Sequence, residues 1–236
     1  MIRYALPLAA ASLLAVPAAA EVQVTATGPV VELTVHESVE AEPDIATVGA
    51  GVTTQARTAV EAMRANATAM RAVVERIKAL GIAERDIQTT GINLGAMYDY
   101  NQQTQRQVFR GYQASNRVSV KLRDIDRTGP VLDALVEAGA TDLNGPDWSI
   151  DDPKPARAQA RRTAIETAHA QALDYARAAG FANVRLLEIN EALPPSRPMP
   201  MMRMAQAEAA SDASTPVQPG MIEAGVTVTV TYEMTR

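Results

Sequence analysis

The hydrophobic and polar positions alternate along the segment 30–42, VVELTVHESVEAE, with Val31, Leu33 and Val35 on one face. Strict alternation over this length is typical of a half-buried β-strand. A second strand is predicted after the break at Pro43, and a hairpin is the simplest connection between the two. The inward positions of this second strand are Ala46, Val48, Ala50 and Val52.

The spacing of apolar residues changes to threes and fours between residues 58 and 81, which predicts an amphipathic helix. Thr58 and Glu61 stand three residues apart at its start and form a capping box. Gly81 supplies the left-handed residue that ends such a helix. The predicted apolar stripe consists of Val60, Met63, Ala67, Met70, Val74 and Ile77.

Two strands, 86–100 and 108–124, are predicted on either side of the polar loop NQQTQRQ. In the second strand Asn116 interrupts an apolar face, so it is expected near the rim of the sheet or hydrogen-bonded. A shorter helix is predicted in 128–140, with Gly129 and a proline in its first turn. The apolar positions of the second strand are Tyr112, Ala114, Val118, Val120 and Leu122.

The C-terminal part predicts a short strand carrying Trp148, a long helix between Pro153 and Gly180, and strands at 184–190 and 225–234. The helix has a narrow face of small side chains that would let it lie close to a sheet: Ile165, Ala168, Ala172, Ala176 and Ala179. The last strand alternates most clearly, with Val226, Val228, Val230 and Tyr232 on one side.

The elements therefore run β-β-α-β-β-α-β-α-β-β, which predicts an α+β fold of two β-α-β-β-like halves. The approximate halves are 45–124 and 142–234, each an antiparallel sheet with helices packed on one face. Between the last two strands the segment 194–220 is rich in Pro, Ala and Ser and has no periodicity, so it is expected to be a long mobile loop.

The acidic residues after the tryptophan, Asp147, Asp151 and Asp152, are the strongest local candidates for catalysis. Asp152 followed by Pro153 is a helix-start signal, with the aspartate as N-cap and the proline at the first helical position. Asp151 and Asp152 also suit the positive end of the helix dipole. Carboxylates stabilised as anions are poor general acids, so these residues are interpreted as a helix cap rather than a catalytic pair.

The first twenty residues contain one Arg, an apolar run and the small residues AAA, which is typical of a cleaved secretory signal peptide at 1–20. Its apolar run is short for a membrane-spanning helix, which needs roughly 20 such residues. The chain has no Cys, so neither a lipid-modified cysteine nor a disulfide is expected. The folded domain of the mature chain is predicted at 30–236. The mature chain is expected to be soluble in a bacterial periplasm.

The charge balance argues against nucleic acid as the main partner. The chain has 22 basic and 27 acidic residues, and removal of 1–20 takes away Arg3 and no acid. The remaining basic residues are dispersed along the sequence instead of forming a patch.

Catalytic and metal motifs are largely missing from the sequence. His36 and His169 have no second ligand at metal-binding spacing, and each is interpreted as a partly exposed surface histidine. No Ser lies in a G-x-S-x-G turn. The stretch GAGVTT lacks the rest of a nucleotide-binding fingerprint, and its glycines are expected to permit close packing of a helix on the sheet. No cofactor is expected.

One segment with chemical character is MPMMRM, in which four thioethers fall within six residues: Met199, Met201, Met202 and Met204. Soft thioethers in an oxidising compartment could bind Cu(I) or be oxidised reversibly to sulfoxide. Two alternatives remain open. The adaptable Met side chains could dock an envelope protein through the 194–220 loop, or the segment could be a linker without function.

Several segments taken in order resemble the SIMPL domain family: PDIATVGAGVTTQA, the helix AVEAMRANATAMRAVVERIKALGI, ERDIQTTGINL, GYQASNRVSV, LNGPDWSIDDP and ARRTAIETAHAQALDYARAAG. This family includes the 26 kDa periplasmic immunogenic proteins and oxidative stress defence proteins. The resemblance runs from about Val30 to the C-terminus. It implies a secreted, cysteine-poor α+β protein, periplasmic or outer-membrane associated, with no catalytic residues to carry over.

The function expected from the sequence is therefore non-enzymatic: a periplasmic homo-oligomer that contributes to envelope or oxidative stress tolerance through binding or assembly. Unpaired strand edges favour self-association. The alternative is a Cu(I) binder or oxidant scavenger based on the methionine cluster. A hydrolase would require two perturbed carboxylates facing each other in a pocket.

Overall fold

The computed structural model describes residues 26–192 and 215–236. The predicted signal peptide and the four clustered methionines lie outside the described residues. The order of elements predicted from the sequence is confirmed. The elements are β1 (Val30–Ala41), β2 (Ile45–Ala56), α1 (Ala59–Ala79), β3 (Ile87–Asn101), β4 (Arg106–Leu122), α2 (Thr128–Glu137), β5 (Asp142–Ser149), α3 (Lys154–Ala178), β6 (Asn183–Ala192) and β7 (Ile222–Thr235).

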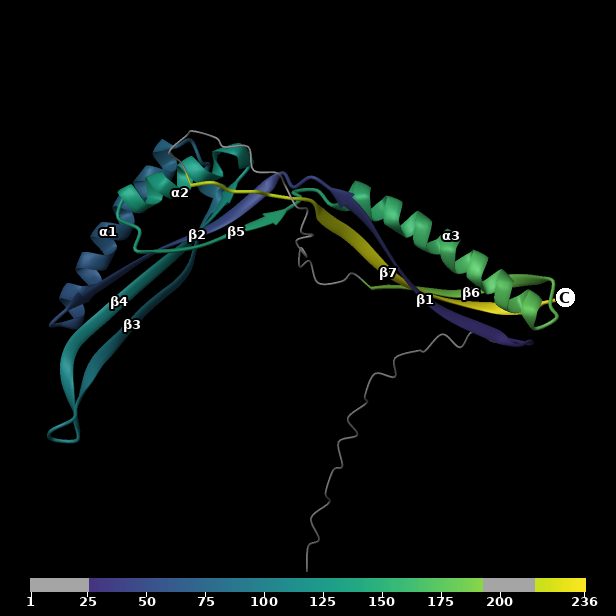
Figure 1. Ribbon diagram of the computed structural model, residues 1–236, viewed down its shortest axis with the longest axis horizontal. Coiled ribbons are helices and arrows are strands. Elements are labelled where there is room, and N and C mark those ends of the chain that lie inside the picture. The colour runs from purple at the N-terminus through teal and green to yellow at the C-terminus, as the bar shows by residue number, and fades with distance from the viewer. Residues whose placement is uncertain (1–25, 193–214) are drawn as a thin grey trace, which may run out of the picture.

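The strands form two separate antiparallel sheets, and each sheet has helices on one face (Figure 1). Lobe one contains the four-stranded sheet β3-β4-β2-β5 with α1 and α2, and lobe two contains the three-stranded sheet β1-β7-β6 with α3. The predicted α+β class is confirmed.

The expected hairpin between the first two strands is wrong. β1 pairs with β7 along its whole length, from Val30 opposite Glu233 to Ala41 opposite Ile222. β2 lies instead in the middle of the other sheet, between β4 and β5. The chain thus leaves lobe two after β1, builds all the strands of lobe one, and returns to lobe two at α3.

Each lobe contains one β-α-β-β unit, but the boundaries differ from the expected halves. In lobe one the unit is β2-α1-β3-β4, and in lobe two it is β1-α3-β6-β7. The sheet order matches as well, because β2-β4-β3 corresponds to β1-β7-β6. The first strand of the second unit is therefore β1, and β5 is an extra strand on the sheet of lobe one.

The glycines of β2 make room for β5 rather than for a helix. A Cβ atom at Gly49 would lie 1.8 Å from Asn144 Oδ1, and one at Gly51 would lie 3.2 Å from Asp142 Cβ. Asn144 and Asp142 both belong to β5, which pairs with β2 at these positions. A side chain at Gly49 would therefore force the Asn144 side chain out of its place on β5.

The core of lobe one lies between α1, α2 and the sheet. The buried face of α1 is shifted from the predicted stripe, because Val60 and Ala67 are exposed and Asn66 lies in its centre. Asn66 Nδ2 donates to Val52 O at 2.8 Å and to Ala114 O at 3.1 Å. On β4 the predicted apolar row is buried except for Tyr112, which is half-buried, and Asn116 Oδ1 is buried without a hydrogen-bond partner among the described residues. The buried residues of α1 are Ala62, Asn66, Met70, Val73 and Ile77.

The core of lobe two depends on the small side chains of α3. Alanine recurs at every fourth position of its buried face: Ala160, Ala164, Ala168, Ala172 and Ala176. The first four of these alanines pack against the buried row of β7, which is Val226, Val228, Val230 and Tyr232 as predicted. A methyl group in place of a larger side chain lets the helix axis approach the sheet closely.

Two segments outside the sheets are held to the lobes by hydrogen bonds. Thr215, within the predicted loop 194–220, donates to the Asp133 carboxylate of α2 from its amide at 3.1 Å and from its hydroxyl at 2.6 Å. A Cβ atom at Gly129 would lie 2.3 Å from Thr215 O, so this approach requires glycine. At the other end of the chain, Glu233 Oε1 accepts from the amides of Thr27 at 2.7 Å and Gly28 at 2.6 Å.

Candidate functional site

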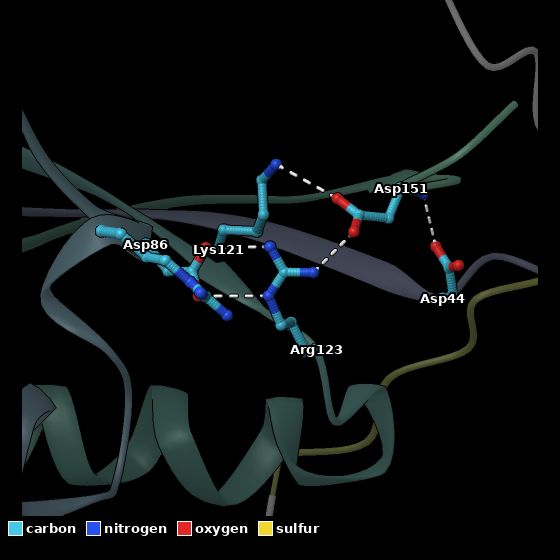
Figure 2. Close-up of polar contacts among 6 residues, drawn as sticks. Asp44, Asp86, Lys121, Arg123 and Asp151 are labelled. Carbon is cyan, nitrogen blue, oxygen red and sulfur yellow. Dashed lines mark hydrogen bonds and ion pairs between the residues drawn. The ribbon is translucent and has the colours of Figure 1, made fainter.

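The two lobes are joined by short crossovers that are bonded to each other. One crossover links β1 to β2 and contains Asp44, and the other links β5 to α3 and contains Asp151. Asp44 N donates to Ser149 O at 3.2 Å, and Asp44 Oδ1 accepts from Asp151 N at 2.7 Å. The crossovers therefore lie side by side at the junction of the lobes (Figure 2).

An ion network fixes this junction to the sheet of lobe one. Arg123, just after β4, donates from Nη1 to Asp151 Oδ2 at 2.6 Å. Its Nε and Nη2 atoms donate to the two carboxylate oxygens of Asp86, each at 3.2 Å. Lys121 Nζ lies 3.7 Å from Asp151 Oδ1. Figure 2 shows the Arg123 guanidinium between the two carboxylates, with Lys121 on the Asp151 side.

The network holds both carboxylates as anions. Hydrogen bonds from Arg123 lower the pKa of Asp86 and the pKa of Asp151 below the ordinary value of 3.8. The same bonds raise the pKa of the Arg123 guanidinium. A general acid at neutral pH needs the opposite shift, a raised carboxyl pKa. The geometry favours a structural clamp or an anion-binding surface over proton transfer.

A pocket of about 200 Å³ opens beside the network. It lies among the end of α1, the short 3₁₀ turn Glu84–Asp86, the end of β4, and the start of α2. Its apolar lining is Leu80, Ile82, Ala83, Leu122 and Val131. Its charged lining is four basic residues, Arg85, Lys121, Arg123 and Arg127, and two acidic residues, Asp86 and Asp124.

The acidic residues singled out from the sequence do not converge. Asp151 turns toward Arg123 and Lys121, so its expected place at the dipole of the helix is corrected to a place in the ion network. Asp152 Oδ1 accepts from Lys154 N at 3.1 Å, but α3 begins at Lys154 and Pro153 occupies the N-cap instead of the first helical position. Asp147 is exposed on β5.

The other structural residues predicted at helix ends and in the core are placed as follows. Glu61 N donates to Thr58 Oγ1 at 3.3 Å, and Thr58 Oγ1 donates to Glu61 Oε2 at 2.9 Å. Trp148 pairs with Ala46 across β5 and β2 and packs against the core of lobe one. These contacts serve the fold and do not reach the pocket.

The histidines lie apart from each other in lobe two. His36 Nδ1 lies 3.1 Å from Thr227 Oγ1 on the outer face of the sheet, and the His169 ring lies 5.7 Å from the Tyr232 ring. Within residues 26–192 and 215–236, no group of three or more His, Asp or Glu side chains is arranged to hold a metal ion. Across the same ranges, no helix is long and apolar enough to cross a membrane.

The basic pocket was missed in the sequence because its residues come from separate strand and helix ends. Arg85 and Asp86 lie just before β3. Lys121 lies at the end of β4, and Arg123 and Arg127 come after that strand. The antiparallel pairing of Ile87 with Val120 brings the two groups together. The available signal was the charged runs ERD and KLRDIDR, one at each end of the same predicted hairpin.

A second candidate site is an apolar surface on the part of the sheet that the helices leave uncovered. α1 packs mainly on β2 and β4, so the core-side face of β3 is exposed at Ile92 and Leu94. Register places these residues opposite Asn116 and Ala114 of β4. The hairpin continues past α1 as an arm (Figure 1).

The arm carries a row of aromatic rings on this same face. Tyr98 stands opposite Phe109, with their ring centroids 5.7 Å apart, and Phe109 lies 5.3 Å from Tyr112. Tyr98 and Phe109 are exposed. We call the exposed core-side residues of this hairpin the arm face: Ile92, Leu94, Tyr98, Tyr100 and Phe109.

Lobe two repeats the arrangement. α3 covers β1 and β7 more than β6, and Leu186 and Ile189 of β6 are exposed. They stand opposite the buried residues Tyr232 and Val230, so they also belong to the core side of their sheet. Both β-α-β-β units thus leave the third strand of the sheet apolar and uncovered.

The fold and these surfaces define a duplicated α+β protein with helices on one face of each sheet. The chain belongs to the SIMPL family, described as a protein of unknown function (DUF541), whose family model matches residues 31–232. It is 35% identical over 200 residues to the 26 kDa periplasmic immunogenic protein of Brucella melitensis, covering 82% of this chain and 80% of that protein. The Brucella abortus protein of the same name is 34% identical over the same shares. The uncharacterized protein YggE of Escherichia coli is 28% identical over 183 residues, covering 78% of this chain and 74% of that protein.

Proposed function

We propose that this chain is a non-enzymatic periplasmic protein that works by self-assembly, and that the assembled form contributes to envelope or oxidative stress tolerance. The periplasmic location is supported by the names of the Brucella relatives. The self-assembly is supported by the uncovered core-side faces of β3 and β6.

The occupant proposed for the arm face is a second copy of the same chain. The arm face lies on the side of the sheet that α1 covers over β2 and β4, and β3, which carries most of its residues, is an edge strand. An exposed edge and a contiguous apolar face are the features that oligomers cover. Because both lobes carry such a face, one copy offers two surfaces of the same kind to its neighbours.

The test is the mass of the mature chain, residues 21–236, in solution. Tyr98→Ser with Phe109→Ser removes two aromatic side chains from the arm face. Each ring is about half exposed in one copy, so covering it contributes about half of the 1.5–3 kcal/mol of a fully buried side chain, and the dissociation constant should rise at least about tenfold. Sedimentation equilibrium measures this change.

The matched control is Val108→Ser. Val108 is 45% exposed, close to the 47% of Phe109, but it pairs with Asp99 on the opposite face of the arm. It should leave the mass unchanged. A wild-type chain that is monomeric at all accessible concentrations, or a double variant that assembles as well as the control, contradicts self-assembly through this face.

The link to stress tolerance needs a separate measurement. The double variant and the Val108→Ser control are expressed in a strain lacking the native gene, and survival under peroxide is compared. The assembly-deficient variant should fail to restore survival while the control restores it. A folded, monomeric variant that restores survival fully would separate the phenotype from assembly.

The methionine cluster remains an alternative proposal based on its sequence alone, because Met199, Met201, Met202 and Met204 lie outside the described residues. Cu(I) affinity is compared between the mature chain and a variant with all four residues changed to Leu. Much weaker binding by the variant supports thioether chemistry, and equal weak binding eliminates it.

A further inference from the structure

The pocket beside the ion network is lined by more basic than acidic side chains, and Asp151, outside the lining, pairs with two of them, Arg123 and Lys121. The whole chain carries a net charge of −5, yet the pocket lining contains four basic and two acidic residues. One acid, Asp86, is already bonded through both oxygens to Arg123. The other, Asp124, is an exposed residue on the loop between β4 and α2.

Two of the four cations have no strong partner within the described part of the chain. Arg85 lies 3.8 Å from Asp86, a carboxylate that Arg123 already occupies, and the Arg85 side chain is 78% exposed. Arg127 is exposed and forms no ion pair with any described residue. Guanidinium groups that are not needed to hold the fold are available to bind an anion in a bidentate manner.

The start of α2 borders the pocket. Arg127 is the N-cap of this helix, no side chain accepts a hydrogen bond from its first turn, and that turn contains no acidic residue. The first turn of α2 lies next to the pocket, to which Arg127 and Val131 contribute, and it carries no acidic side chain of its own.

We propose that this pocket binds a small phosphate group. A volume of about 200 Å³ is smaller than the roughly 300–1,000 Å³ of pockets for drug-sized ligands, and it suits a compact oxyanion. Arg85 and Arg127 supply the ligand contacts, Lys121 contributes charge, and Arg123 fixes the pocket wall through Asp86 and Asp151. The site is independent of the proposed assembly, because it lies at the opposite end of the β3–β4 hairpin from the arm tip.

The test uses the mature chain and titration calorimetry with inorganic phosphate, against sodium chloride at equal ionic strength. Arg85→Ala with Arg127→Ala should raise the dissociation constant for phosphate at least about tenfold, as expected for the loss of charge-assisted hydrogen bonds. The matched control is Arg64→Ala with Arg71→Ala, which removes the same charge from exposed positions on α1. Tryptophan fluorescence checks that both variants are folded.

Parallel titrations with glycerol phosphate and with phosphatidylglycerol vesicles distinguish a free phosphate from a lipid headgroup. The site is supported if the affinity for any one of these probes is lower in the Arg85/Arg127 variant and unchanged in the control. The probe that shows this difference identifies the source of the phosphate. Absence of saturable binding for all three probes, or an equal loss in the two variants, overturns it.

Discussion

Asn66 is the residue whose replacement most directly tests the packing of lobe one. Its side chain is 2% exposed, and Nδ2 donates to Val52 O at 2.8 Å and to Ala114 O at 3.1 Å. Each such bond contributes about 1 kcal/mol, and a buried carbonyl left without its donor costs about 1–3 kcal/mol. Asn66→Ala should therefore lower the free energy of unfolding by about 2–4 kcal/mol, or the Tm by about 5–15 °C for a chain of this size.

The single tryptophan makes lobe one observable by itself. Trp148 packs against the core of lobe one, so its fluorescence during urea denaturation follows that lobe. Far-ultraviolet circular dichroism follows the helices of both lobes. The fluorescence midpoint of Asn66→Ala should fall relative to the wild type, and Asn66→Asp should fall further because a carboxylate would face the same two carbonyl oxygens.

Thr68→Ala is the matched control on the solvent side of the same helix. Thr68 is exposed and bonds to Arg64 O within the helix, so its loss should change the free energy of unfolding by less than about 0.5 kcal/mol. If Asn66→Ala shifts the fluorescence midpoint no more than Thr68→Ala does, then the hydrogen bonds from Asn66 to the carbonyl groups of Val52 and Ala114 do not stabilise lobe one, and the prediction is wrong.

Three further predictions concern lobe two and the junction. Ala168→Leu, on the buried face of α3, should overpack that lobe and cost about 1–3 kcal/mol, measured as a lower dichroism midpoint with little change in Trp148 fluorescence. Hydrogen bonds from Arg185 and Thr27 lower the pKa of Glu233 from 4.5 to about 2, so the stability that this carboxylate adds is complete above pH 4.5 and is lost as the pH falls toward 2. The difference in urea midpoint between the wild type and Glu233→Gln should therefore shrink to zero over that range. A difference that stays constant with pH contradicts the ion pair. Asp152→Ala removes the hydrogen bond from Lys154 N and should lower the free energy of unfolding by about 0.5–1.5 kcal/mol without loss of function in a folded population, checked by melting and complementation together.

The order and type of the elements could be predicted because their signals are local. The alternation of β7 and the four-residue spacing of alanines on α3 are visible within a short window, and both describe buried rows in the structure. Pairing between strands could not be predicted in the same way. β1 has the alternation of any half-buried strand, and nothing within Val30–Ala41 indicates that its partner is the last strand of the chain.

The candidate sites were harder to predict because each depends on what lies next to it. Ile92 and Leu94 have the pattern of core residues, and only the position of α1 leaves them exposed. Arg85 and Arg127 are ordinary surface residues in sequence, and they share a pocket only because β3 and β4 pair. Asn66 lies outside the predicted apolar stripe, and its contribution to stability depends on two carbonyl groups from different strands.

The placement of lobe one inside lobe two has a consequence for synthesis. Thr27 and Glu233, which are bonded in the folded protein, are 206 residues apart in the chain. β1 leaves the ribosome first, and its partner β7 leaves last, so lobe two stays incomplete until translation ends. A chain ended before Ile222 would keep every strand of the β3-β4-β2-β5 sheet but would leave β1 with no strand to pair with, and it should be recognised by chaperones and proteases as unfinished.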